Sequence, residues 1–388
     1  MKIPYYVQIA LTELQNAGYE AYIVGGAVRD FLLGFKPHDF DIATNALPEQ
    51  IQVVFANYNI ITTGIKHGTV GIIISKKLIE ITTFRADEDY EDYRHPTFVR
   101  FVDGLKEDLS RRDFTINALA YNQDVIDYFD GVNDLNKKII RCVGDPNTRF
   151  TEDVLRILRA LRFSCQLKFT IDQDTKAAIF KFKDLLVNIS NERIAIEINK
   201  MLLSDITIVL EEYLSVFQVI FPELDKSSIS EKIGRLRRSE ENLIVRTAIL
   251  FYDFKDPEKA IDFLRPSKIF KRKVLIVITN QELEITEDSI ELCKLLTTFY
   301  REDLLNIEGF RRTLGFGTNI KDIFPKILNK PTKVTDLNIK GIDLINLGIS
   351  VGPKIAEILN ELLLLVIEDR INNKHSELEE YVIKKYCK

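Results

Sequence analysis

The feature that most constrains the fold is a glycine pair followed by two alternating aspartates near the start of the chain. Gly25 and Gly26 follow a short apolar run, and Asp39 and Asp41 lie a few residues downstream in the same expected strand–helix–strand segment. Glycine lets backbone N–H groups approach a phosphate closely. Carboxylates at i and i+2 of a strand point to one face, where they can hold a divalent metal together. Triphosphate and metal in one place indicate nucleotidyl transfer.

Each half of this segment also has a simpler interpretation. A glycine pair after a strand often forms only a turn, and Asp-x-Asp is common at solvated strand edges. The combination in this order favours chemistry. A dinucleotide-binding site fits poorly, because the pattern G-x-G-x-x-G is absent and the ribose-binding acid is expected about twenty residues further on, not nine.

Length, cysteines and hydropathy limit the class of protein. The chain has 388 residues, enough for two or more domains. No run of about eighteen apolar residues and no secretory signal stand out, so we expect a cytoplasmic protein without a membrane partner. The four cysteines and four histidines are scattered. This pattern fits reduced thiols and argues against zinc, so any metal should be a hard cation on carboxylates.

The net charge of −5 neither favours nor excludes nucleic acid, and local charge is more useful. Two basic groups are candidates for contact with a phosphate backbone. The alternative interpretation is a solvated helix face balanced by nearby acids. The groups are Lys232, Arg235, Arg237, Arg238 and Arg246, and Arg265, Lys268, Lys271, Arg272 and Lys273.

The hydrophobic pattern changes along the chain. Strands are expected at residues 21–24, 39–43, 68–74, 79–84 and 125–129, with helices at 27–33 and 47–55 between them. From about residue 150 the apolar spacing is helical, for example at 152–163, 193–203 and 240–252. Residues 315–317 and Pro331 are candidate joints. The order predicts an α/β head followed by a long helical region.

The candidate metal ligands are Asp39 and Asp41, which suit Mg²⁺. A third carboxylate often completes such a site, and Glu80 on a neighbouring expected strand is the candidate, with an exposed strand glutamate as the alternative. Gly25 and Gly26 would offer N–H groups to a triphosphate. Arg29 is expected near the positive N-terminal end of the next helix, which favours phosphate.

Two further segments carry candidate nucleotide contacts. Arg111, Arg112, Asp113 and Asn117 suit a triphosphate and a ribose, since guanidinium groups bind phosphate and a carboxylate accepts from sugar hydroxyls. The alternative, an Asp113 helix cap with surface arginines, is favoured for this segment taken alone.

In the second segment, Thr151 is expected to cap a helix whose Arg156, Arg159 and Arg162 follow one face. Asp153 is expected to join that face. A carboxylate beside a guanidinium can read a base edge.

With these motifs in place, the chain resembles the class II tRNA nucleotidyltransferases, which include the bacterial CCA-adding enzymes and their poly(A) polymerase relatives. Four motifs stand in the family's order: 25–30 with Asp39 and Asp41, then 111–113, 152–156 and 192–197. The resemblance implies an α+β fold. A polymerase-β-like head with a mixed sheet (1–140) would precede an all-helical neck (141–205), body (206–315) and tail (316–388).

The resemblance also implies roles. Asp39 and Asp41 would bind Mg²⁺, and Gly26, Arg29 and Arg111 would contact the nucleotide, with Arg112 and Asp113 at its ribose and triphosphate. Asp153 and Arg156 would act as a protein template for CTP and then ATP. Arg159 and Arg162 match further nucleotide-contacting arginines, and residues 192–197 look like a helix that supports the template. Residues 87–96 resemble the family's flexible loop, associated with the switch from C to A addition, and include Asp89, Tyr90, Asp92 and Arg94.

The expected function is therefore addition of C, C and A to the tRNA 3′ end from CTP and ATP, without a nucleic-acid template and with release of pyrophosphate. The partner would be tRNA, gripped at its acceptor arm by the body and tail, and not DNA. The alternatives are an A-adding enzyme, a CC-adding enzyme or a poly(A) polymerase of the same family. An RNA-binding protein without catalysis is a further alternative that the intact Asp39, Asp41 and Arg29 argue against.

Overall fold

The computed structural model describes residues 2–37, 39–90 and 96–387. The chain divides into two compact units, Met1–Ser230 and Glu231–Lys388. The division falls within helix α12 (Lys226–Arg238). No helix among the described residues is long and apolar enough to cross a membrane. The four cysteines are free thiols, three of them buried.

The first unit begins with a mixed sheet of seven strands in the order β3-β4-β5-β2-β1-β8-β9. Strands β2 and β5 run parallel, and the other neighbours are antiparallel. The strands are β1 (Ala21–Val24), β2 (Asp41–Thr44), β3 (Asn59–Ile61), β4 (Thr69–Ile74), β5 (Lys77–Thr83), β8 (Leu119–Asn122) and β9 (Asp124–Asp127).

The register of the central strands places the acidic residues. Asp41 lies opposite Val24 of β1 on one side and opposite Glu80 of β5 on the other. Burial alternates along β5, with Ile79 and Ile81 buried and Glu80 exposed. Asp41 is likewise the exposed residue of β2. The strand expected at 39–43 begins at Asp41, two residues later than predicted. Asp39 therefore precedes β2, and strand geometry does not place its carboxylate on the same face as that of Asp41.

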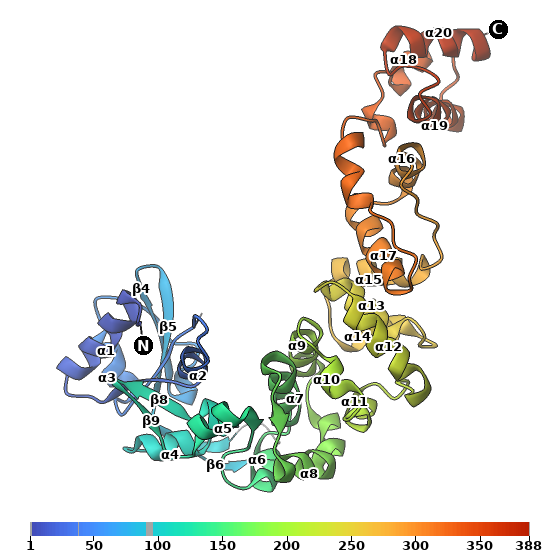
Figure 1. Ribbon diagram of the computed structural model, residues 1–388. Coiled ribbons are helices and arrows are strands. Elements are labelled where there is room, and N and C mark those ends of the chain that lie inside the picture. The colour runs from blue at the N-terminus through green and yellow to red at the C-terminus, as the bar shows by residue number, and fades with distance from the viewer. Residues whose placement is uncertain (1, 38, 91–95, 388) are drawn as a thin grey trace. The chain divides into compact units, whose positions relative to one another are not determined.

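Helices cover this sheet. In Figure 1, α1 and α3 lie together against the sheet. A buried cluster that includes Val24, Ala43, Phe84 and Leu109 joins the sheet to α4. The helices are α1 (Tyr5–Asn16), α2 (Gly26–Leu32), α3 (Pro48–Val54), α4 (Leu105–Ser110) and α5 (Gly131–Lys137).

A separate antiparallel ribbon lies between β5 and β8 in the sequence. It is formed by β6 (Arg85–Tyr90) and β7 (Pro96–Phe101). Asp89 and Tyr90 of the expected flexible loop therefore belong to a strand. Asp92 and Arg94 lie outside the described residues.

The rest of the first unit is helical apart from a short parallel bridge between β10 (Ile139–Ile140) and β11 (Thr170–Ile171). Helices α7 and α9 pack against each other. The helices are α6 (Pro146–Glu152), α7 (Leu155–Leu167), α8 (Gln173–Phe182), α9 (Asn191–Leu202), α10 (Thr207–Leu210) and α11 (Leu214–Ile220).

The expectation of one helix capped by Thr151 is wrong. Asp145 caps α6 by accepting from the N–H groups of Asn147 and Thr148, and Thr151 lies inside that helix. The helix ends at Glu152, and Asp153 is extended, with φ −139° and ψ 101°. Asp153 is therefore not on the helix face of Arg156. It sits at the break between two helices, where its carboxylate accepts from the N–H of Leu155.

The second unit is built from helices, and no strand occurs among its described residues. They are α13 (Leu243–Phe251), α14 (Pro257–Phe263), α15 (Lys268–Thr279), α16 (Ser289–Thr298), α17 (Arg301–Thr313), α18 (Gly341–Asn346), α19 (Pro353–Ile367) and α20 (His375–Tyr386).

The first expected basic group lies only partly at the surface, because Arg237 and Arg238 are exposed whereas Lys232, Arg235 and Arg246 are buried. Lys232 and Arg235 are fully buried. The Lys232 ammonium donates to the Leu250 carbonyl at 2.9 Å and pairs with Asp253. The Arg235 guanidinium lies 4.2 Å from the ring centre of Tyr252 and 4.1 Å from that of Phe310. These cations hold the second unit together and cannot reach a phosphate backbone.

Candidate functional site

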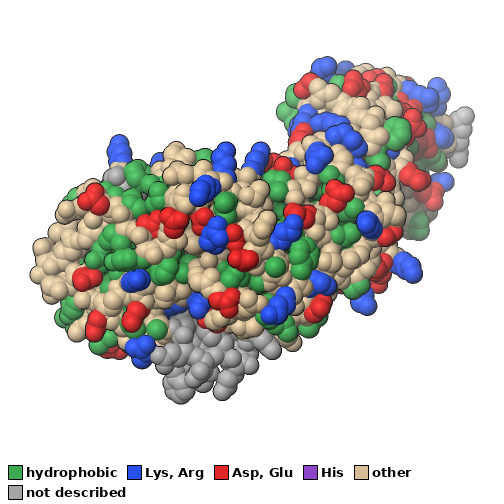
Figure 2. Space-filling model, turned by 60° about the horizontal axis from the view of Figure 1, so that its bottom comes forward, with side chains coloured by type: hydrophobic (Ala, Val, Ile, Leu, Met, Phe, Trp, Pro, Cys, Tyr) green, Lys and Arg blue, Asp and Glu red, His purple; other side chains and the backbone are tan. Residues whose placement is uncertain are grey.

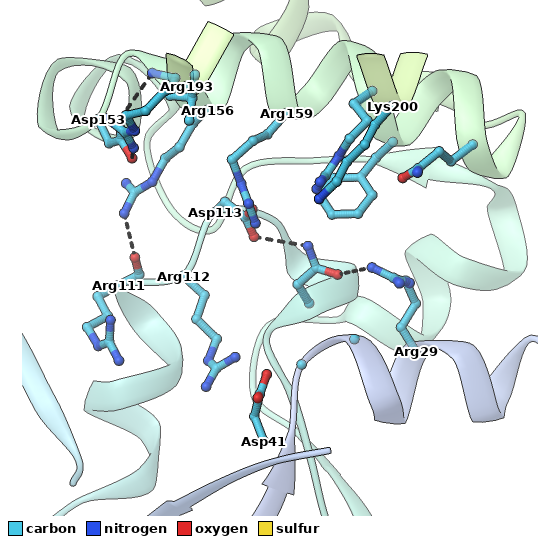
Figure 3. Close-up of a pocket in the computed structure, with 17 residues that line it drawn as sticks. Arg29, Asp41, Arg111, Arg112, Asp113, Asp153, Arg156, Arg159, Arg193 and Lys200 are labelled. Atoms are coloured by element: carbon cyan, nitrogen blue, oxygen red, sulfur yellow. Dashed lines mark hydrogen bonds and ion pairs between the residues drawn. The ribbon is translucent and has the colours of Figure 1, made fainter. Parts of the chain in front are cut away.

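A pocket of about 640 Å³ opens between the β1–α2 turn and helices α7 and α9. Figure 3 shows Asp41 and Arg112 on one side and Asp153, Arg156, Arg193 and Lys200 on the other. The lining residues are Gly25, Gly26, Arg29, Asp41, Arg111, Arg112, Asp113, Asn117, Asp153, Leu155, Arg156, Arg159, Arg162, Phe163, Gln166, Arg193 and Lys200.

The glycine turn forms one wall. Gly25 has φ +70° and ψ −128°, a conformation that side chains other than glycine rarely adopt. A Cβ at this position would lie 2.8 Å from a guanidinium nitrogen of Arg112. Glycine is therefore required both for the turn and for the close approach of Arg112.

Three carboxylates lie at the edge of the sheet beside this turn. Removal from water and the negative charge of Glu80 raise the pKa of Asp41; Arg112 lowers it and Asp39 raises it further. Asp39 and Glu80 are exposed and do not line the pocket. Of the three, Asp41 alone lines the pocket, and the negative charges of the other two raise its pKa.

Arg29 is fixed from two directions. Its guanidinium donates to Asp30 at 2.7 Å and to the side-chain oxygen of Asn117 at 2.7 Å. Asn117 in turn donates to Asp113 at 3.0 Å. This chain of hydrogen bonds, visible in Figure 3, links α2 to the segment that follows α4.

Asp113 is the centre of this network. Burial would raise the pKa of Asp113, but the ion pair with Arg159 at 2.5 Å and the hydrogen bond from Asn117 lower it to about 2. The carboxylate therefore stays charged at neutral pH. The Asp113 carboxylate forms an ion pair with Arg159 and does not cap a helix, which was the alternative for this residue.

Buried Asp108 orients the two arginines that precede Asp113. Asp108 is 1% exposed and pairs with Arg111 at 2.8 Å and with Arg112 at 3.4 Å. Burial would raise the pKa of Asp108, but these two guanidinium groups hold it below its usual value. Arg112 points from this anchor toward Gly25 and Asp41.

The expected base-reading residues lie at the break between α6 and α7. The Asp153 carboxylate accepts from Arg193 of α9 at 2.9 and 3.3 Å. Arg156 is 8% exposed and donates to Glu152 at 2.6 Å and to the Arg111 carbonyl at 2.9 Å. The acid and the guanidinium are thus held by different neighbours on one side of the pocket.

Arg162 and Phe163 lie in the second half of α7. Arg162 lies 3.1 Å from Glu197 of α9, and its guanidinium lies 4.2 Å from the centre of the Phe163 ring. Arg29 and Arg159 approach the same ring at 5.1 and 5.6 Å. One aromatic ring therefore spaces three guanidinium groups.

The structure brings most of the expected site residues to this pocket and leaves Asp39 and Glu80 at its margin. Sequence reasoning missed Leu155, Phe163, Gln166, Arg193 and Lys200. A signal existed for two of them, because Arg193, Glu197 and Lys200 recur at i, i+4 and i+7 of an expected helix. No signal in the sequence pairs Arg193 with Asp153 forty residues away.

The pocket is strongly basic. Eight of its lining residues are arginine or lysine and three are aspartate, whereas the whole chain has a net charge of −5. Such a concentration of guanidinium groups suits a ligand with several phosphates.

The residues beside the glycine turn fit a hard divalent cation. No group of three or more His, Cys, Asp or Glu side chains in the described part of the chain is arranged to hold a metal by itself. The donors present are carboxylate oxygens, and removal from water together with the negative charges of Glu80 and Asp39 raises the pKa of Asp41. A cation shared with ligand phosphates would offset these negative charges.

Two family models match the chain. The poly A polymerase head domain matches residues 21–141, and the probable RNA and SrmB-binding site of polymerase A matches residues 168–227.

Curated relatives and solved structures match over nearly the full length. The CCA-adding enzyme of Leuconostoc mesenteroides is 37% identical, over 96% of this chain and 94% of that protein. The CCA-adding enzyme of Pediococcus pentosaceus is 38% identical, over 94% of this chain and 93% of that protein. The Bacillus stearothermophilus CCA-adding enzyme in complex with CTP has a TM-score of 0.82 at 28% identity and covers 99% of this chain and 98% of that one. With a head of the poly A polymerase kind and this similarity along the whole chain, the protein belongs to the CCA-adding enzymes, the class II tRNA nucleotidyltransferases.

Proposed function

We propose that this chain extends the 3′ end of tRNA with C, C and A from CTP and ATP in the pocket between the β1–α2 turn and α7. The single observation that carries the proposal is the charge of the pocket: eight cations face three carboxylates in an acidic protein. On the face shown in Figure 2, basic and acidic side chains are interspersed. The pocket therefore presents a triphosphate with more cationic than anionic side chains.

The carboxylate edge is the proposed place of bond formation. Asp39 and Asp41 would hold Mg²⁺, with Glu80 as a candidate third carboxylate. When bound there, a divalent ion would neutralise charge at the α-phosphate and would lower the pKa of the attacking tRNA hydroxyl. Arg112, which approaches Gly25 and Asp41, is placed to bind the phosphate that Asp41 faces. The bond formed joins the tRNA 3′ oxygen to the α-phosphorus, and pyrophosphate leaves.

The phosphates beyond the α-phosphate need donors that are already oriented. Gly25 and Gly26 offer backbone N–H groups at the start of α2, and Arg29 is fixed by Asp30 and Asn117. Arg111 is oriented by Asp108. Asp113, held charged beside Arg159, is the acceptor available for a ribose hydroxyl.

Asp153 and Arg156 are the proposed selectors of the base. Cytosine and adenine share an amino group next to an unprotonated ring nitrogen, whereas uracil and guanine present a carbonyl oxygen next to a ring N–H. A carboxylate that accepts and a guanidinium that donates therefore match cytosine and adenine alike and mismatch the other two bases. One acid and one arginine suffice for both substrates.

The remaining assignments concern larger segments. We assign residues 1–140 to the catalytic head, 141–205 to a neck that carries the selector, 206–315 to a body and 316–388 to a tail that contacts the tRNA acceptor arm. Residues 87–96, of which 87–90 belong to β6 and Pro96 begins β7, would govern the switch from C to A addition. We also assign the protein to the cytoplasm, and four cysteines without disulfides are compatible with this localisation.

The experiment that tests the function uses labelled CTP and ATP with three tRNAs that lack CCA, end in C, or end in CC. A CCA-adding enzyme incorporates two C and one A, one C and one A, and one A, respectively. Incorporation of A alone or of C alone, or a long A tail, would replace the proposal with one of the other family activities. Asp41→Asn should abolish incorporation while Asp124→Asn, an exposed strand aspartate outside the pocket, should not.

A further inference from the structure

Helix α9 places a lysine on the pocket that the proposed roles do not use. Arg193, Glu197 and Lys200 lie at i, i+4 and i+7 on one face of α9, the face toward α7. Arg193 pairs with Asp153, and Glu197 pairs with Arg162. Lys200 lines the pocket at the end of this row, across from Asp41 in Figure 3.

Among the cations that line the pocket, Lys200 differs in having no carboxylate partner in the described part of the chain. Each of the seven arginines that line the pocket has a carboxylate partner within 4 Å: Asp30, Asp108 (two arginines), Glu152, Asp113, Glu197 and Asp153. Lys200 has no ion pair with any residue of the described ranges 2–37, 39–90 and 96–387. Among the cations that line the pocket, its ammonium group is therefore the one that has no carboxylate partner in the described part of the protein.

Two side chains of α7 that line the same pocket as Lys200 are suited to an anion, namely Arg162 and Gln166. Arg162 is 7% exposed, and its Nε atom has no hydrogen-bond partner among the described residues although Glu197 is close. Burial lowers the pKa of Arg162; Glu197 opposes this shift, and the nearby positive charges of Arg159 and Arg29 add to it. Gln166, one turn after Arg162 on α7, adds a neutral side chain that can donate.

We propose that Lys200, with Arg162 and Gln166, forms a phosphate subsite on the α7–α9 side of the pocket, separate from the phosphate contacts beside Asp41. The inference rests on the proposed function, because it assumes that the pocket receives a nucleotide and an RNA end. The ligand chemistry is a phosphate. Its source is either the terminal phosphates of the incoming nucleotide or a backbone phosphate of the tRNA acceptor strand.

The test compares Lys200→Met, which removes the charge and keeps the length, with Lys200→Arg, which keeps the charge. Steady-state addition of A is measured on tRNA ending in CC, with KM determined separately for ATP and for tRNA. Loss of a charged hydrogen bond to phosphate should raise one of these KM values about tenfold, with kcat changed less than about threefold because Lys200 is remote from the reacting atoms. Lys77→Met, an exposed lysine outside the pocket, is the matched control.

The two sources give different results. A rise in KM for ATP alone assigns the nucleotide phosphates. A rise in KM for tRNA alone, with a salt dependence of tRNA binding weakened by about one counterion, assigns the RNA backbone. Lys200→Arg should restore either value. If wild-type protein adds A and both KM values of Lys200→Met equal those of Lys77→Met, the subsite is wrong and the proposed function stands. If wild-type protein adds nothing, the proposed function has failed first.

Discussion

The ion pair between Arg193 and Asp153 gives the sharpest test of base selection. Arg193→Gln removes the charge that holds the Asp153 carboxylate at 2.9 and 3.3 Å and leaves the N–H of Leu155 as the remaining contact that the structure gives this carboxylate. The carboxylate can then rotate away from the orientation in which it accepts from a base amino group. We therefore expect a loss of selectivity among the nucleotides, and not only a lower rate of nucleotide addition.

The magnitude follows from the distance and the exposure. Two unit charges 2.9 Å apart would interact by about 6 kcal/mol at an effective dielectric constant near 20, and ion pairs in open solvent contribute about 0.2–1 kcal/mol. Arg193 and Asp153 are 21% and 19% exposed, so we take about 1.5 kcal/mol as the orienting energy between these limits. This energy corresponds to about a tenfold loss in the preference for CTP over UTP.

The assay measures kcat/KM for CTP, ATP, UTP and GTP on tRNA that lacks CCA and on tRNA that ends in CC. Arg193→Lys should retain part of the preference, because a lysine keeps the charge but not the planar geometry. Arg141→Gln is the matched control: Arg141 pairs with Asp134 and Asp172 in the same unit but does not line the pocket. An equal fall for all four nucleotides, with the CTP preference intact, would refute the reasoning and reduce the pair to a support of the fold.

Three further predictions concern the glycine turn, the carboxylate edge and Asp113. Gly25→Ala should weaken CTP binding and stability by more than Gly34→Ala, since both positions have positive φ but only a Cβ at Gly25 would lie 2.8 Å from a guanidinium nitrogen of Arg112; equal losses in melting temperature and in CTP affinity would contradict the close approach. Glu80→Gln should move the acid limb of the pH–rate profile to lower pH, because Glu80 raises the pKa of Asp41 and a lower pKa keeps Asp41 charged in acid; an unmoved limb would argue against this coupling, and activity lost at every pH would make Glu80 a metal ligand. For Asp113, a folded pKa of about 2 against an ordinary 3.8 contributes about 2 kcal/mol of stability that is present above pH 4 and lost as the pH falls toward 2. Urea unfolding of wild type and Asp113→Asn should therefore converge in that window, and a difference that stays constant with pH would disprove the assignment.

Local patterns predicted the parts of the site that lie close together in the sequence. The glycine turn, Arg29 and the arginines of α7 were identifiable, because each depends on spacing within one or two turns of chain. The β2 strand was expected two residues too early, since Phe40 continues the apolar alternation although the strand begins at Asp41. The break at Asp153 was invisible for a similar reason: helical periodicity runs through residues 152–154, and the pairing with Arg193 of α9 stabilises the extended conformation there.

Charge was a poorer guide than spacing. Lys232 and Arg235 suggested a surface for nucleic acid, yet aromatic rings and Asp253 bury them. Sequence could not reveal this, because the partners lie up to 78 residues away, as Thr313 does from Arg235. Lys200 was missed for a different reason: its i+7 spacing from Arg193 places both on one helix face, but the sequence does not show that this face lines the pocket.

The carboxylate partners of the pocket arginines have a consequence for what can enter. A ligand that reaches these guanidinium groups competes with acids that already hold them, so binding is an exchange of one anion for another. A single inorganic phosphate replaces few of these contacts and gains little. A nucleoside triphosphate can displace or share several of them at once, and its affinity should rise steeply with the number of its phosphates. The ion pairs thus favour ligands with several phosphates over small anions that carry only one charged group.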